Sequence, residues 1–126
     1  MTALDQFEFR ILNWVITTIH NGFLDSLMPE ISFLADGGWF WILLAILFIA
    51  RKSTRKMGVT VALALLFGFL VTNVALKPWI ARLRPYDVNT ALQPLISPPS
   101  GFSFPSGHAT SSFAAASAIY RNLKWA

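Results

Sequence analysis

Apolar positions are concentrated in two stretches that predict membrane-crossing helices. The clearer stretch, residues 57–76, contains twenty positions without a charged side chain, and a helix of that length crosses the roughly 30 Å of hydrocarbon in a bilayer. The other stretch, residues 38–50, is short for a crossing, so its helix either begins further back, near Ile31, or lies in a locally thin region. We therefore predict spanning helices over residues 38–50 and 57–76.

The first 36 residues mix apolar and charged positions in a pattern typical of helices that lie along a membrane surface. Between residues 4 and 24, apolar side chains recur at helical spacing while acidic side chains interrupt them. Asn21 and Gly22 favour an end to that helix, and a second short amphipathic piece follows over residues 24–35. The pattern predicts interfacial helices within residues 1–36.

The C-terminal part of the chain predicts one more helix, preceded by a long connection. Residues 106–121 are rich in alanine and serine, and such small side chains let membrane helices approach closely. The connection, residues 77–105, carries several prolines towards its end and is expected to be exposed. The expected fold class is all-α: an incomplete integral-membrane helical bundle in a single domain, residues 1–126, with about three membrane helices.

Composition agrees with a membrane protein and excludes several other classes. Of 126 residues, 55% are hydrophobic and 13% charged, which is too apolar for a typical soluble domain. The formal charge of +4 does not predict nucleic-acid binding, because the bases are divided between membrane-flanking segments. With no cysteine, disulfides and thiolate chemistry are excluded. The N-terminus has acidic residues before its first base, so it does not resemble a cleaved signal peptide.

The basic residues predict an orientation. The segment over residues 51–56 holds four bases and no acid, and short loops of that kind face the cytoplasm. The helix over residues 57–76 would then run outward. Lys77, Arg82 and Arg84, three bases within eight residues, would consequently lie on the outer face.

Lys77 and Arg84 form the first candidate binding block. If the helix continues to Arg84, the seven-residue spacing makes about two turns, so the ammonium and the guanidinium lie on one face and can grip one anion. A planar guanidinium with a mobile ammonium suits a phosphoryl group. Arg82 is expected to point away, towards lipid headgroups, and Asp87 to form an ion pair with Arg84. The alternative is that Lys77 and Arg84 only anchor the helix end.

The second candidate block, residues 105–108, is Pro-Ser-Gly-His at the predicted start of the last helix. Free backbone N–H groups and the positive end of the helix dipole favour an anion there. Ser106 is a natural N-cap whose hydroxyl can instead donate to a phosphate oxygen. Gly107 permits close backbone approach, and His108 carries an imidazole suited to proton transfer. The alternative is a helix cap with an incidental histidine.

Together the two blocks resemble the first two signature motifs of the type-2 phosphatidic acid phosphatase (PAP2) superfamily, the membrane lipid phosphatases related to vanadium haloperoxidases. The matching positions are Lys77-x6-Arg84-Pro85 and Pro105-Ser106-Gly107-His108. The resemblance implies that Lys77, Arg84, Ser106 and Gly107 bind the phosphate and that His108 protonates the leaving group. It also implies metal-independent catalysis through a phosphohistidine, without a cofactor.

The third motif of that family, Ser-Arg-x5-His-x3-Asp with the nucleophilic histidine, does not occur in these 126 residues. The resemblance therefore covers the N-terminal part of the family's fold, and we expect this chain alone to lack its nucleophile. His20 is expected to be an interfacial polar residue rather than a substitute.

Two functions remain open at this point. The first is hydrolysis of a phosphomonoester or pyrophosphate on a membrane lipid such as phosphatidic acid, phosphatidylglycerol phosphate or a polyprenyl pyrophosphate. The second is a non-catalytic membrane protein that binds lipid phosphate or assembles with other helices; a channel subunit has only the polar last helix in its favour. The expected partners are lipid phosphates, membrane lipids and either a second copy or complementing helices. The expected location is a bacterial inner membrane, with the site on its outer face.

Overall fold

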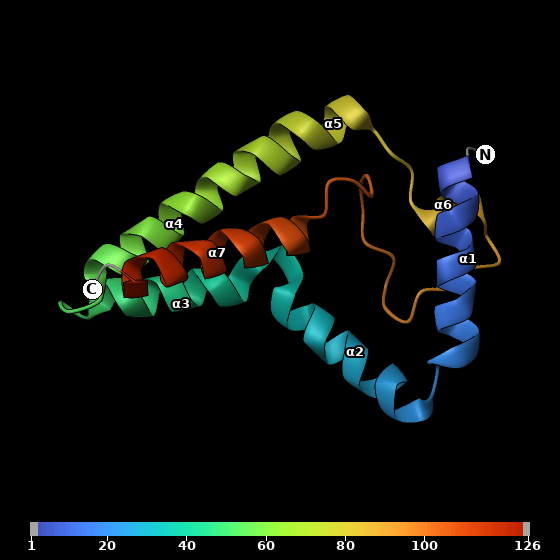
Figure 1. Ribbon diagram of the computed structural model, residues 1–126, viewed down its shortest axis with the longest axis horizontal. Coiled ribbons are helices and arrows are strands. Elements are labelled where there is room, and N and C mark those ends of the chain that lie inside the picture. The colour runs from blue at the N-terminus through green and yellow to red at the C-terminus, as the bar shows by residue number, and fades with distance from the viewer. Residues whose placement is uncertain (1–2, 125–126) are drawn as a thin grey trace.

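Every element that the structure describes is helical (Figure 1). The structure is a computed structural model and describes residues 3–124. In chain order, the elements are α1 (Ala3–Thr18), α2 (Gly22–Ala35), η1 (Asp36–Gly38), α3 (Trp39–Ala50), α4 (Arg55–Phe69), η2 (Leu70–Leu76), α5 (Lys77–Ile80), α6 (Pro85–Val88) and α7 (Gly107–Lys124). The expectation of an all-α fold is confirmed.

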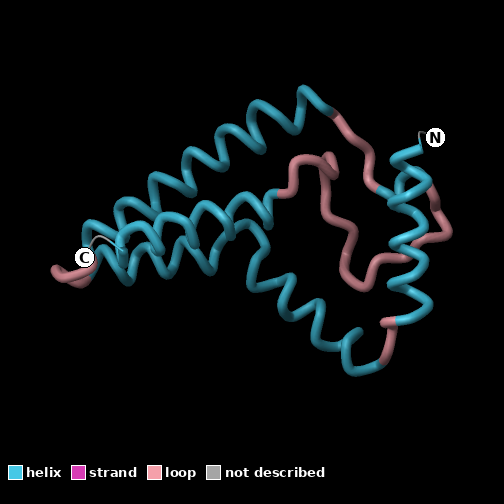
Figure 2. Tube along the Cα trace, in the orientation of Figure 1, coloured by secondary structure: helices cyan, strands magenta, loops and turns pink. Residues whose placement is uncertain are grey.

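Helices α3, α4 and α7 pack side by side into a small bundle (Figures 1 and 2). The buried core of this bundle consists of Ala45, Val61, Ala115 and Ala118. Because these side chains are small, the helix backbones approach closely, as the alanine-rich sequence of the last helix predicts. Helices α3 and α4 approach closely at Gly58, where an added Cβ atom would lie 2.6 Å from the backbone nitrogen of Ile49.

The boundary between α1 and α2 differs from the predicted one. Helix α1 ends at Thr18, and the side-chain oxygen of Asn21 then accepts the backbone N–H of Leu24 at 2.9 Å. Asn21 and Gly22 therefore begin a helix rather than end one. The physical reason is that an asparagine with an extended backbone satisfies an orphan donor of the first helical turn.

Helix α3 begins at Trp39, so of the two alternatives for this span the earlier start near Ile31 is wrong. Gly37 and Gly38 separate α3 from α2, with φ angles of 59° and 71°. Left-handed conformations of this kind end a helix and favour glycine. The chain consequently bends there, so that α3 runs along the bundle while α2 leaves it (Figure 1).

The helix that begins as α4 changes its winding as it approaches the candidate site. The segment η2 is a π-helix, in which the backbone N–H of Lys77 bonds to the carbonyl oxygen of Thr72. Pro78 gives a physical reason for this widening, because it has no N–H and its ring would clash with the carbonyl four residues earlier in a regular α-helix. The helix then ends at Ile80, since Ala81 adopts a left-handed conformation with φ of 48°.

By length and composition alone, two helical runs are apolar enough to cross a membrane: Gly22–Ala50, which continues across the bend at Gly37 and Gly38, and Arg55–Val88. They contain the spans predicted over residues 38–50 and 57–76. Many of their large apolar side chains are exposed, including Leu63 and Phe67 of α4. An apolar exterior of this extent needs lipid or further helices as its neighbour.

The predicted connection over residues 77–105 is less uniform than expected. It contains the short helices α5 and α6, and an irregular loop leads from α6 back to α7 (Figure 2). Most of this loop is exposed, as predicted.

Candidate active site

Lys77 and Gly107 bring the two predicted blocks together. A Cβ atom built on Gly107 would lie 3.9 Å from Lys77 Nζ and 3.8 Å from Asn73 Oδ1. The half-buried lysine therefore places its ammonium group beside the first residue of α7. An anion at this point meets a full positive charge and the positive end of a helix dipole at once. Asn73 is an additional polar neighbour that the sequence analysis did not single out.

Ser106 caps α7, as the sequence predicts. Its Oγ accepts the backbone N–H of Ala109 at 3.2 Å, which leaves the hydroxyl proton able to donate to a ligand. Gly107 and His108 follow as the first two residues of the helix, where backbone N–H groups have no partner within the helix. The side chain of His108 is exposed, and within residues 3–124 no hydrogen bond orients its imidazole.

The position and the hydrogen-bond partners of Arg84 differ from the predicted ones. Because the helix ends with α5, Lys77 and Arg84 do not share a helical face, and Arg84 has an extended backbone just before α6. Its Nε donates to the carbonyl oxygen of Gly101 at 2.9 Å. Asp87 accepts the backbone N–H of Arg84 at 3.3 Å instead of forming the predicted ion pair with the guanidinium. Within the described residues, no hydrogen bond or ion pair joins this guanidinium to the Lys77 side of the site.

The segment around Arg84 runs antiparallel to the last part of the loop before α7. Three contacts, two residues apart in each segment, define the register: Arg82 with Ser103, Arg84 with Gly101, and Tyr86 with Pro99. We call residues 82–86 and 99–103 the paired segments. Because Ser106 follows the second segment closely, this pairing fixes the first block relative to the second.

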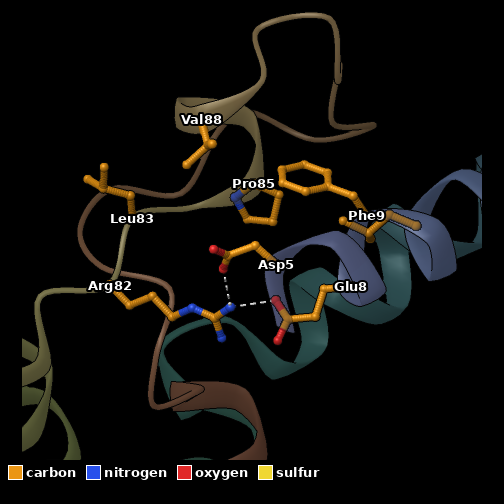
Figure 3. Close-up of a pocket in the computed structure, with 8 residues that line it drawn as sticks. Asp5, Glu8, Phe9, Arg82, Leu83, Pro85 and Val88 are labelled. Atoms are coloured by element: carbon orange, nitrogen blue, oxygen red, sulfur yellow. Dashed lines mark hydrogen bonds and ion pairs between the residues drawn. The ribbon is translucent and has the colours of Figure 1, made fainter. Parts of the chain in front are cut away.

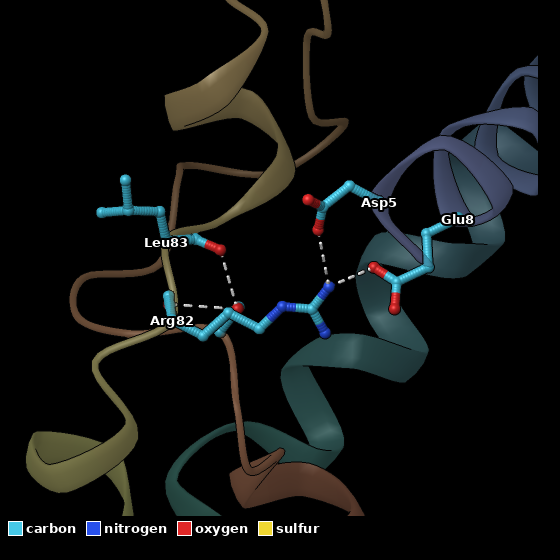
Figure 4. A network of polar contacts seen from close by, with 5 residues as sticks. Asp5, Glu8, Arg82 and Leu83 are labelled. Atoms are coloured by element: carbon cyan, nitrogen blue, oxygen red, sulfur yellow. Dashed lines mark hydrogen bonds and ion pairs between the residues drawn. The ribbon is translucent and has the colours of Figure 1, made fainter. Parts of the chain in front are cut away.

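Arg82 connects the site to α1 (Figure 4). Its Nη2 lies 3.5 Å from Asp5 Oδ1 and also contacts Glu8 Oε2. The prediction that Arg82 points towards lipid headgroups is therefore wrong, because two carboxylates on one face of α1 are better partners for a guanidinium. The spacing of Asp5 and Glu8, three residues apart on a predicted helix, is the sequence signal for such a contact.

A pocket of about 220 Å³ lies between α1 and the paired segments (Figure 3). The ion-paired side chains of Asp5, Glu8 and Arg82 line one part of it. The rest of the wall is apolar and comes from α1, from α6 and from the residue after Arg82, namely Phe9, Leu12, Leu83, Pro85 and Val88. Sequence reasoning did not locate this pocket, because its walls come from segments more than sixty residues apart.

The remaining histidine and the acidic residues do not extend the site. His20 Nε2 lies 3.2 Å from Asp25 Oδ2, near the start of α2. Among residues 3–124, no group of three or more His, Asp or Glu side chains is arranged to hold a metal ion.

Comparisons with known proteins point to one family. The sequence model of the PAP2 superfamily matches residues 53–126. The undecaprenyl-diphosphatase BcrC of Bacillus subtilis is 34% identical over 110 residues, which cover 83% of this chain and 54% of that protein. An undecaprenyl-diphosphatase of Sulfolobus acidocaldarius is 29% identical over 103 residues, which cover 80% of this chain and 46% of that protein. The chain thus spans about half the length of these relatives, and no solved structure matches it significantly.

Proposed function

Because the chain belongs to the PAP2 superfamily, we propose that it supplies the phosphate-binding part of the active site of a membrane lipid phosphatase. The observation that carries this proposal is the position of Lys77 Nζ beside Gly107. This proximity brings the ends of two helices together, and each end contributes a group that stabilises an anion.

The residues of the two blocks take distinct roles in this proposal. Lys77 and the capping end of α7, with Ser106 and Gly107, bind the oxygens of the phosphoryl group that is transferred. Arg84 binds the same group through its Nη atoms, since its Nε is already bonded to Gly101. For that to happen, the paired segments must bring the guanidinium closer to Lys77 when substrate binds.

His108 is the proposed general acid. Its exposed imidazole lies one residue from Gly107, so the protonated ring can donate to the bridging oxygen of a phosphoryl group held there. The P–O bond breaks as a histidine outside residues 1–126 attacks phosphorus, and water then releases inorganic phosphate from that histidine. The proton given up by His108 stays on the departing lipid oxygen.

The proposed substrate class is a polyprenyl diphosphate. Both matched relatives are named undecaprenyl-diphosphatases, and the apolar helices would place the site next to the lipid. We further propose that the chain lies in a bacterial inner membrane with residues 77–108 on the outer face, since the basic segment 51–56 favours the cytoplasm.

Phosphate binding tests the proposal on the chain itself. The 126-residue protein in lipid nanodiscs is titrated with orthovanadate, a tetrahedral stand-in for phosphate. We expect binding that weakens at least tenfold, about 1.4 kcal/mol, in Lys77→Ala and in Arg84→Ala. Lys52→Ala, which removes the same charge from the basic segment 51–56, is the matched control and should leave binding unchanged. Equal binding by all four proteins would contradict the proposed site.

Turnover requires a polypeptide that also carries a third motif. With undecaprenyl diphosphate in nanodiscs, it should release phosphate in the presence of EDTA, and His108→Ala should lower the rate by roughly 10²–10⁴. Phosphatidic acid and phosphatidylglycerol phosphate, assayed in parallel, identify the preferred lipid. Activity that depends on added metal and is indifferent to His108 would overturn the mechanism.

A further inference from the structure

Thr72 belongs to η2 and faces α7. These two segments lead to the proposed phosphate cradle, which we define as Lys77, Ser106 and Gly107. Thr72 is 4% exposed, and within residues 3–124 it is the only polar residue that is buried. Removing a hydroxyl from water is unfavourable unless it forms a hydrogen bond. The hydrogen-bond partner of the Thr72 hydroxyl therefore indicates the role of this residue.

The hydroxyl of Thr72 reaches α7. Its Oγ1 lies 3.0 Å from Thr110 Oγ1, and Thr110 Oγ1 in turn donates to the carbonyl oxygen of Ser106 at 2.9 Å. A hydroxyl carries one proton and a carbonyl can only accept. Thr110 therefore gives its proton to Ser106, and Thr72 must be the donor to Thr110.

The backbone of Thr72 reaches the other half of the cradle. Its carbonyl oxygen accepts the N–H of Lys77, five residues later, in the π-helical segment η2. One residue thus holds the backbone of Lys77 through its carbonyl and, by way of Thr110, the backbone of Ser106 through its hydroxyl. Gly68 leaves room for this approach, since an added Cβ atom there would lie 3.0 Å from Thr110 Cγ2.

We propose that Thr72 and Thr110 are a pair of positioning residues that hold the lysine end and the serine end of the cradle at the offset needed to bind one phosphoryl group. This inference rests on the proposed function. Two helices that bind the same small anion must keep a fixed offset, because a shift of about an ångström weakens contacts to its oxygens. A buried bond between the helices resists such a shift more than the long Lys77 side chain can.

Hydroxyl deletion tests the pair in the nanodisc-bound 126-residue chain, with orthovanadate as the probe. Thr72→Val removes the hydroxyl and keeps the shape, and vanadate binding should weaken about three- to tenfold, as expected for the loss of one hydrogen bond. Thr72→Ser retains the hydroxyl and should bind within about twofold of the parent. The control is Thr60→Val on α4, whose hydroxyl donates within its own helix to Lys56 O at 2.9 Å; its binding should not change.

The double variant Thr72→Val/Thr110→Val separates a pair from two independent contacts. If the hydroxyls act together, the double variant should bind vanadate no more weakly than Thr110→Val alone. Additive losses would overturn the pairing, and so would a Thr72→Val chain that binds like Thr60→Val. If Thr72→Val does not fold, Thr110→Ser and Thr110→Ala decide: equal binding by these two overturns the proposal.

Lys77→Ala in the same titration distinguishes the two proposals. If Lys77→Ala binds vanadate as well as the parent, the proposed function fails. If Lys77→Ala weakens binding and the threonine variants do not, only the positioning role fails.

Discussion

Ser103 holds the carbonyl oxygen of Arg82 with two of its groups. Its backbone N–H donates to that oxygen at 2.8 Å, and its hydroxyl lies 3.1 Å from the same oxygen and 2.9 Å from the carbonyl oxygen of Leu83. One serine thereby closes the paired segments at the end nearest the second block. It follows that the place of Arg84 depends on a side chain that neither motif contains.

Replacing Ser103 should loosen the paired segments without unfolding the bundle. Ser103→Ala keeps the backbone bond and removes the shared hydroxyl bond, so vanadate binding should weaken about threefold while the unfolding temperature stays the same. Ser100→Ala, an exposed position in the same loop, is the control and should change neither quantity. If Ser103→Ala lowers the unfolding temperature and Ser100→Ala does not, the serine stabilises the fold rather than the site.

Adding one methyl group at Gly107 should block the site and leave the fold intact. The Cβ atom of Gly107→Ala would meet Lys77 Nζ and Asn73 Oδ1 at 3.9 and 3.8 Å, which is ordinary contact and strains nothing. It would, however, occupy the space through which, in the proposed site, a phosphate oxygen would reach the backbone N–H groups of α7. We expect vanadate binding to weaken at least tenfold, about 1.4 kcal/mol, at an unchanged unfolding temperature. Unchanged binding would place the anion elsewhere.

Replacing Gly58 by alanine should instead lower the stability of the fold. There the added Cβ atom would lie 2.6 Å from Ile49 N and 2.8 Å from Ala45 O, so α3 and α4 must move apart. Overpacking of this kind costs about 1–3 kcal/mol, measurable as unfolding in increasing denaturing detergent. Gly22→Ala, where nothing lies within 4 Å of the added atom, is the matched control. Equal stabilities for the two variants would contradict the close contact of α3 with α4.

Breaking the contact of Arg82 with α1 should release that helix locally. Arg82→Gln removes the charge that Asp5 and Glu8 share, so amide hydrogens of residues 3–18 should exchange faster with deuterium. The side chains are about one-third exposed, and we expect the loss of stability to remain below about 1 kcal/mol. In the parent chain, high salt should also speed amide exchange over residues 3–18, but by less.

A charge swap provides the control for this contact. Arg82→Glu alone should release α1 further, because it places three acids together, whereas Arg82→Glu combined with Glu8→Arg should restore slow exchange. Exchange over residues 3–18 that is the same in all variants would show that α1 is held by its apolar contacts alone.

The sequence was sufficient to predict the elements that depend on local patterns. The alanine-rich stretch after Ser106 predicts a closely packed helix, and the structure buries Ala115 and Ala118. The serine itself predicts the cap, which the bond from Ala109 confirms. In each case the determining residues lie within one or two turns of each other.

The course of the chain between Lys77 and Arg84 was not predictable in the same way. The left-handed conformation of Ala81 ends the helix early, although alanine favours a right-handed helix and rarely adopts a positive φ. Contacts from distant segments help to hold this conformation, since Ser103 binds the carbonyl of Arg82 and α1 binds its guanidinium. The helical periodicity of residues 77–84 contains no information about such long-range contacts.

The paired segments also divide the connection before α7 into two parts with different tolerance to change. Residues 90–98 form a tip that lies beyond α6 and beyond the last contact of the paired segments, Tyr86 with Pro99. Insertions or deletions in that tip leave the register of the contacts below it unaltered, and so do not displace the cradle. The tip can therefore change in length and sequence while the contacts that hold Arg82 and Arg84 keep their register.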